Sequence, residues 1–182
     1  MTAIVNRQLY APVSIILHWG MLLLIVVVYS CMLLREYFPQ GSDIRNGLKT
    51  WHFMLGLSVL LLVIVRIVSR LLNSRPAITP EPPAWQMFVA RALHLALYAF
   101  MLAMPIAGWL ILSASGKTIP FFGLEIFALV GPSKALAGQV KEVHETIATI
   151  GYFLIGVHAS AALLHHYWFK DNTLLRMLPG KR

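Results

Sequence analysis

Histidines recur along one stretch of the chain at a spacing that suits a redox cofactor. His144, Gly151, His158 and His165 follow one another at intervals of seven residues. Seven residues of α-helix fall about 20° short of two full turns, so these positions form one slowly drifting stripe. Neutral imidazole is a standard axial ligand of haem iron. The stripe therefore predicts a helix that gives one ligand to each of two haems, with Gly151 leaving clearance for a broad, flat group.

The distance between the first two histidines fits a membrane. His144 and His158 are 14 residues apart, which is about 21 Å at the rise of an α-helix. The hydrocarbon core of a bilayer is about 30 Å thick. We therefore expect one of these histidines near each membrane face.

The composition points to the same setting. The chain has 182 residues, of which 58% are hydrophobic and 12% are charged, with a mean hydropathy of +0.72. A soluble domain would carry about 25% charged residues. The net charge of +8 is typical of basic cytoplasmic loops in so apolar a chain, and no nucleic-acid partner is expected. Cys31 is the one cysteine, which excludes an intrachain disulfide and covalent c-type haem attachment.

Four apolar runs predict the elements that hold the histidines. We expect helices at about 13–34, 48–71, 86–114 and 140–169 within a single membrane domain, 1–182, of the all-α class. Glycine and proline interrupt residues 116–140, so we expect this segment to lie on the membrane surface and not to form a fifth span. Residues 76–83 contain four prolines and predict an extended connector.

The distribution of charge predicts the orientation. Four spans put both termini on one side, which holds nine basic and two acidic residues, against six basic and five acidic on the other. Because basic residues collect on the cytoplasmic side, both termini are expected in the cytoplasm.

This topology gives each histidine a depth. His18 and His158 fall near the cytoplasmic face, and His52 and His144 near the opposite one. His94 falls at nearly the same depth as His18, so depth alone leaves open which of the two faces His158. Zinc suits the set less well because its ligands form one compact tetrahedron.

Four segments resemble bacterial cytochrome b561, and most closely the branch of superoxide:ubiquinone oxidoreductases, or superoxide oxidases. They are LHWGMLLLIVVVYSCMLLREYFP, KTWHFMLGLSVLLLVIVRIV, PPAWQM and HETIATIGYFLIGVHASAALLHHYWFKDNTLLRMLP. The resemblance covers essentially the whole chain. It implies a four-helix protein of the bacterial inner membrane that binds two haem b groups. The implied axial ligands are His18, His52, His144 and His158, which leaves His94 without a ligand role.

The resemblance also implies an activity, which is one-electron transfer from superoxide at the periplasmic face to ubiquinone in the bilayer. Superoxide is an anion, so its approach requires positive potential. The candidate steering residues are Arg45, Lys49, Lys117, Lys134 and Lys141.

On the cytoplasmic side, His165 and His166 are candidate quinone contacts, because histidine can donate hydrogen bonds and protons near neutral pH. The alternative function is that of a cytochrome b relay subunit, which passes electrons between a partner dehydrogenase or hydrogenase and the quinone pool.

Overall fold

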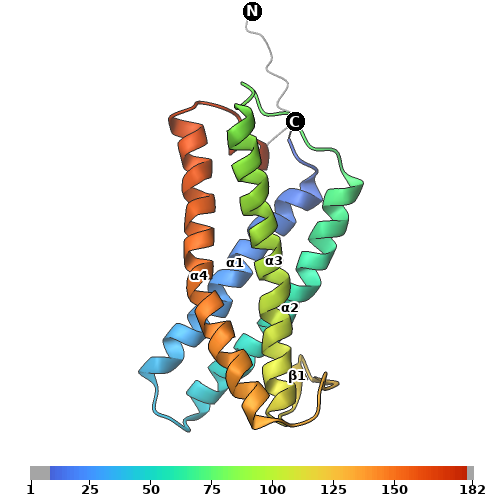
Figure 1. Ribbon diagram of the computed structural model, residues 1–182, viewed down its shortest axis with the longest axis vertical. Coiled ribbons are helices and arrows are strands. Elements are labelled where there is room, and N and C mark those ends of the chain that lie inside the picture. Colours follow the sequence, from blue (N-terminus) through green and yellow to red (C-terminus); the bar gives the residue numbers. More distant parts are fainter. Residues whose placement is uncertain (1–8, 180–182) are drawn as a thin grey trace, which may run out of the picture.

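The computed structural model describes residues 9–179, and four long helices account for most of them. These are α1 (Pro12–Leu34), α2 (Asp43–Leu72), α3 (Ala84–Ala114) and α4 (Lys134–Tyr167), as Figure 1 shows. Two 3₁₀ turns, η1 (Arg35–Tyr37) and η2 (Leu175–Met177), follow α1 and α4. Each of the four helices is long and apolar enough to cross a membrane. The predicted four-helix membrane bundle is confirmed.

Two helices begin about five or six residues earlier than the hydrophobic pattern predicts, because serine caps extend them. α2 begins at Asp43, where residue 48 was expected, and α4 begins at Lys134, where residue 140 was expected. The Ser42 hydroxyl accepts from the backbone N–H of Arg45, and the Ser133 hydroxyl accepts from that of Leu136. Such caps satisfy N–H groups that have no partner within the helix. α4 also ends at Tyr167, before the expected residue 169.

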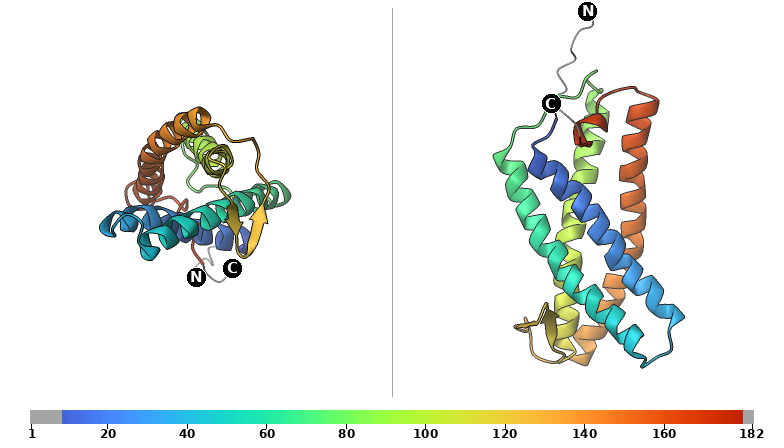
Figure 2. Two further views of the ribbon diagram at one scale, coloured as in Figure 1. Left: turned by 90° about the horizontal axis from the view of Figure 1, so that it is seen from below. Right: turned by 180° about the vertical axis from the view of Figure 1, so that it is seen from behind.

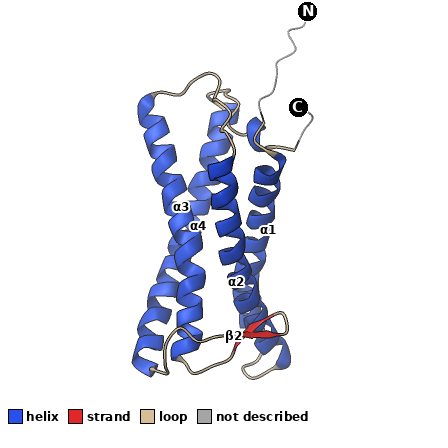
Figure 3. Cartoon of the chain, turned by 90° about the vertical axis from the view of Figure 1, so that its right-hand side faces the viewer, coloured by secondary structure: helices blue, strands red, loops and turns tan. Residues whose placement is uncertain are grey.

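The segment between α3 and α4 contains a β-hairpin. Strands β1 (Ile119–Phe121) and β2 (Leu124–Ile126) pair antiparallel, with Ile119 opposite Ile126 (Figure 3). The two loop residues, Phe122 and Gly123, both have positive φ, as tight hairpins require. Residues 116–140 thus contain this hairpin and the first turns of α4, and over residues 9–179 no candidate span lies between α3 and α4. Their location on the membrane surface stays a prediction.

Side chains of α2 and α3 hold the hairpin segment in place. Ser113, which is buried, accepts from the backbone N–H of Leu129 at 3.0 Å. The Trp109 indole donates to the Phe127 carbonyl at 2.9 Å. Ile119 of β1 is itself 1% exposed, and the backbone N–H of Phe122 donates to the Met54 sulfur of α2 at 3.4 Å. We call this the hairpin end of the bundle, and the opposite end the tail end.

The helices pack in sequence order. α1 lies against α2, α2 against α3, and α3 against α4, while α4 has no comparable packing against α1 or α2 within residues 9–179. Figure 2 shows the bundle along its axis and from behind. A buried cluster of Met21, Val59 and Val63 joins α1 to α2. Large apolar side chains are exposed along all four helices, as expected of a surface that faces lipid.

The tail after α4 folds back over the tail end. The Trp19 indole donates to the Met177 carbonyl at 2.7 Å. Asn172 bonds twice with Thr79 in the connector between α2 and α3, at 3.1 and 2.9 Å. The tail thereby ties α1, α4 and the connector together. The two chain termini, whose cytoplasmic location the charge pattern predicts, lie outside the described residues.

Candidate functional site

At the hairpin end, two histidines from different helices face each other. The ring centroids of His52 (α2) and His144 (α4) are 6.4 Å apart, with an interplanar angle of 76°. His52 Nδ1 lies 3.0 Å from the Val28 carbonyl, which can only accept, so this nitrogen carries the ring proton and Nε2 keeps its lone pair. His144 lies against Gly108 of α3. Nδ1 of His144 is buried without a hydrogen-bond partner.

At the tail end, a second pair forms in the same way. The ring centroids of His18 (α1) and His158 (α4) are 6.1 Å apart, with an interplanar angle of 77°. Arg66 Nη2 lies 3.1 Å from His18 Nδ1. A guanidinium only donates, so His18 Nδ1 is the acceptor in this contact. Arg66 also donates to the Ser14 carbonyl at 3.2 Å, which fixes the guanidinium between α1 and α2.

His94 joins the tail-end pair. Its ring centroid is 5.3 Å from that of His158, at an interplanar angle of 80°. His94 Nδ1 donates to the Ala90 carbonyl of its own helix at 2.5 Å. The structure therefore brings three histidines together here, as their equal depth predicts, and proximity alone does not select the partner of His158.

Gly151 lies between the two pairs on α4, and side chains of two other helices fill the space beside it. A Cβ at this buried glycine would lie 2.5 Å from Phe100 Cζ and 2.5 Å from Tyr29 Oη. Tyr29 Oη donates to the Ala148 carbonyl at 2.7 Å, and the Tyr29 ring lies 4.4 Å from that of Tyr152. Phe100 and Tyr29 thus lie where the absent Gly151 side chain would be, and the role of Gly151 as clearance for a flat cofactor stays a prediction.

Tyr29 and Phe100 are site residues that the sequence did not reveal. A glycine on the histidine stripe signals a close approach, but it does not identify the side chains that approach. Both residues sit in uniformly apolar runs, where periodicity does not set the rotation of one helix against another.

The spacing within each pair suits a metal held between two imidazoles. Two metal–nitrogen bonds of about 2 Å, plus about 1 Å from each nitrogen to its ring centre, would separate the centroids by about 6 Å. The measured separations are 6.1 and 6.4 Å. In the described part of the chain, no three His, Cys, Asp or Glu side chains gather into a metal site. The geometry therefore favours a metal with one imidazole on each side over a tetrahedral zinc site.

The five candidate steering residues differ in whether their charged groups already bind other groups of the protein. Arg45 donates to the carbonyls of Arg35 and Phe38 and pairs with Glu36 at 3.0 Å, so it stabilises the α1–α2 connection. Lys141 pairs with Glu145 at 3.6 Å. Over residues 9–179, the three others have no carboxylate within ion-pair distance; they are Lys49, Lys117 and Lys134.

The two candidate quinone contacts also differ. His165 Nδ1 lies 2.5 Å from Asp171 Oδ2 in the tail, and the Asp171 side chain is 3% exposed. Burial raises the pKa of Asp171, but hydrogen bonds from His165 and Thr173 outweigh it and hold that pKa below its usual range. The ring of His166 packs instead against that of Tyr167, with centroids 4.7 Å apart. His165 is thus fixed by the tail, whereas His166 is not.

Comparisons with known proteins cover nearly the whole chain. The profile of the family described as prokaryotic cytochrome b561 matches residues 9–180. "Cytochrome b561 homolog 1" of Escherichia coli (strain K12) is 42% identical over 173 residues, which are 95% of this chain and 98% of that protein. "Probable superoxide oxidase CybB" of Yersinia pestis is 38% identical, over 95% of this chain and 97% of that protein. "Cytochrome b561 homolog 2" of Escherichia coli is 28% identical.

Sequence, fold and histidine geometry therefore agree. Two imidazole pairs stand at two levels of a four-helix membrane bundle, and relatives match the chain almost from end to end. The chain belongs to the prokaryotic cytochrome b561 family, membrane electron-transfer proteins that bind haem b.

Proposed function

We propose that this chain, as a single membrane domain, binds two haem b groups, oxidises superoxide at the hairpin end and reduces ubiquinone. His52 with His144, and His18 with His158, would hold the two haem irons. The observation that carries the proposal is the pair of centroid separations, 6.4 and 6.1 Å, at two levels of one helix. The substrates are proposed from the resemblance to superoxide oxidases, which the name of the Yersinia pestis relative supports.

The residues present fit haem, with one rearrangement required. The hydrogen bond from His52 to Val28 leaves Nε2 free to bind iron, as axial ligation needs. Ligation through His18 Nε2 requires the ring proton on Nδ1, and Nδ1 then no longer accepts from Arg66. In this proposal the Arg66 guanidinium turns to a haem propionate, an acceptor that suits its fork of donors.

Haem b bound at the two pairs would supply one-electron redox centres near the two membrane faces. The chain's own residues then control how the substrate approaches and how water is kept out of the space between the two pairs. Lys49, Lys117 and Lys134 give positive potential at the hairpin end, where an anion approaches. Between the pairs, Gly151 lets Phe100 and Tyr29 pack onto α4, so protein fills the middle of the bundle and keeps water out of it.

At the tail end, His165 is the proposed proton donor to the reduced quinone. Asp171 bonds its Nδ1, which leaves Nε2 as the atom that can face a quinone oxygen. Two superoxide anions lose one electron each and leave as dioxygen. One ubiquinone gains both electrons and two protons and becomes ubiquinol, so electrons and protons balance.

The orientation is part of the proposal. In the sequence, the two terminal segments and the connector between the second and third spans carry nine basic residues, against six in the other two loops, and basic residues favour the cytoplasmic side. The hairpin end, with the His52 and His144 pair, then faces the periplasm.

The test uses the purified, haem-containing protein in lipid nanodiscs. Xanthine oxidase generates superoxide, and reduction of a short-chain ubiquinone is followed by its absorbance. We expect quinone reduction that depends on the protein and that superoxide dismutase abolishes. The Lys117→Gln and Lys134→Gln double variant should react more slowly, with a weaker dependence on salt. A haem-replete protein that does not react with superoxide contradicts the proposal and favours the relay function.

A further inference from the structure

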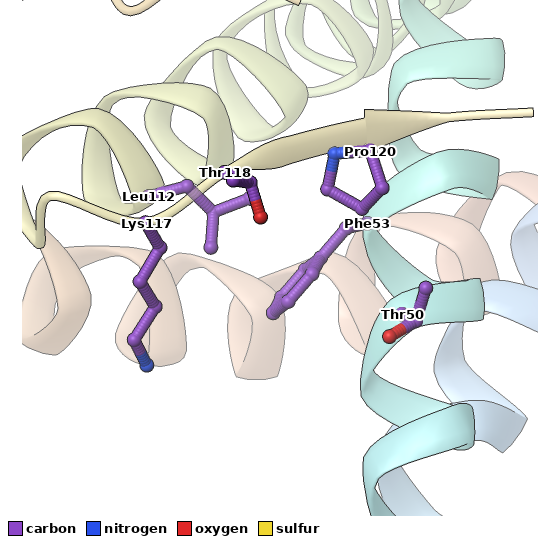
Figure 4. A pocket seen from close by; sticks show the side chains of 6 residues that line it. All are labelled: Thr50, Phe53, Leu112, Lys117, Thr118 and Pro120. Carbon is purple, nitrogen blue, oxygen red and sulfur yellow. The ribbon is translucent and has the colours of Figure 1, made fainter. Parts of the chain in front are cut away.

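A cavity beside the hairpin is not used by the proposed electron path. Its volume is about 370 Å³. It lies between α2, α3 and the start of the hairpin, as Figure 4 shows. Its lining side chains are Thr50, Phe53, Leu112, Lys117, Thr118 and Pro120.

The walls of the cavity are fixed by contacts on both sides. The backbone N–H of Lys117 donates to the Leu112 carbonyl at 3.1 Å. Gly116, with φ +64°, makes the turn that carries the chain from α3 toward the cavity, a conformation that favours glycine. Beyond it, Phe122 N–H donates to the Met54 sulfur at 3.4 Å. These contacts fix the backbone around the cavity, which is open to its surroundings on the side of the exposed residues Thr50, Lys117 and Thr118.

The cavity lies beside the histidine pair and is separate from the space between its rings. Phe53 follows His52 by one residue, and Thr50 precedes it by two. Helix geometry places these side chains about 100° and about 160° around α2 from His52. The Phe53 ring stands edge-on to the His52 ring, with centroids 6.0 Å apart, and so forms the wall between cavity and pair.

The cavity is much larger than a molecule of the size of superoxide needs. Ligand pockets range from about 300 to 1,000 Å³, whereas a molecule as small as water takes about 30 Å³. A cavity of about 370 Å³ matches a small organic molecule of about one ring.

The lining residues define the chemistry of that molecule. Phe53, Leu112 and Pro120 give an apolar surface, and an aromatic ring would pack on Phe53. Thr50 donates its hydroxyl proton to the Asn46 carbonyl at 3.1 Å, so its oxygen is left to accept. Lys117 contributes the positive charge among the lining residues.

We infer that this cavity is a binding site for a one-ring, hydroxylated aromatic anion. The ring lies on Phe53, a ring hydroxyl donates to Thr50, and the carboxylate or sulfonate group pairs with Lys117. This site is independent of haem ligation, but it shares Lys117 with the proposed approach of superoxide.

One acidic residue opposes such a ligand. Glu125 is directly opposite Pro120 in the hairpin, so the two side chains lie on the same face. Glu125 is exposed and is not among the lining residues, and its negative charge on this face would weaken the binding of an anion. Glu125→Gln should therefore bind the ligand more tightly, by about two- to fivefold.

The test measures the binding of 4-hydroxybenzoate to the purified full chain in nanodiscs by isothermal titration calorimetry. We expect saturable binding of one ligand per chain, and weaker binding of phenol, which lacks the carboxylate. Lys117→Gln should weaken binding about tenfold. Lys134→Gln, which removes an exposed lysine at the same end, is the matched control and should bind as the wild type does.

A second pair of variants tests the cavity itself. Thr118 is exposed at the mouth, so Thr118→Trp should fill the cavity and abolish binding without disturbing the core, and Thr118→Ser should bind normally. The inference is overturned if the wild type shows no saturable binding, if Thr118→Trp binds normally, or if Lys134→Gln weakens binding as much as Lys117→Gln does. Because binding is measured directly, these results are independent of the superoxide assay.

Discussion

Single residues set the two levels of the site. His52 and His144 face each other at the hairpin end of the bundle, and His18 faces His158 at the tail end. The sequence alone predicts these histidines and their spacing, because a helix converts residue number directly into depth. The neighbours that tune them, such as Val28 at His52 and Arg66 at His18, are not predictable in this way. They depend on how each helix is rotated toward the next.

The close packing at Gly151 gives a prediction for a single substitution. Gly151→Ala would place a methyl group 2.5 Å from Phe100 Cζ and Tyr29 Oη, and such overpacking costs about 1–3 kcal/mol. We expect a lower midpoint of thermal unfolding for the purified protein in detergent. Gly156→Ala is the matched control. No atom lies within 4 Å of its added Cβ, so it should be neutral or stabilising by about 0.5–1 kcal/mol. Equal effects of the two variants would refute the close approach at Gly151.

Among the elements, the four helices were predictable and their starts were not. The apolar runs locate the spans because every helix in lipid must satisfy its own backbone. Ser42 and Ser133 extend α2 and α4 into polar sequence that hydropathy assigns to loops. The hairpin was missed because its strands are three residues long and its stability comes from anchors on α3, such as Ser113.

Asp171 of the tail bonds His165 near the end of α4. This contact predicts that the stability of the protein decreases in acid. A carboxyl whose pKa is lowered in the folded state contributes stability that is fully present above its unfolded pKa of about 3.9. That contribution is lost as pH falls through the lower, folded pKa. We expect the midpoint temperature of thermal unfolding of the wild type to decrease once the pH falls below about 4.

The matching variant is Asp171→Asn, which keeps an oxygen near His165 but removes the charge. It should be less stable than the wild type at pH 7, and the difference should shrink as the pH falls below about 4. Circular dichroism during heating, repeated across pH 3 to 7, follows both proteins. A difference that stays constant over this range would show that the Asp171 charge does not stabilise the fold.

For the whole molecule, the charge asymmetry predicts the direction in which the bundle crosses the membrane. Lys117→Cys, at the hairpin end, should react with a membrane-impermeant maleimide in intact spheroplasts. Glu81→Cys, in the connector at the tail end, should react only after lysis. The native Cys31 is buried and gives a low background in both. The opposite labelling pattern would reverse the orientation and move the superoxide face to the cytoplasm.

The haem content of histidine variants, determined as the pyridine haemochrome per purified chain, tests which histidines hold the haems. We expect two haem b groups in the wild type, one in His144→Ala and one in His18→Ala. His94→Ala is the discriminating variant, because its ring lies 5.3 Å from that of His158 and it should still bind two. Two haems in His144→Ala, or one in His94→Ala with two in His18→Ala, would contradict the ligand assignment.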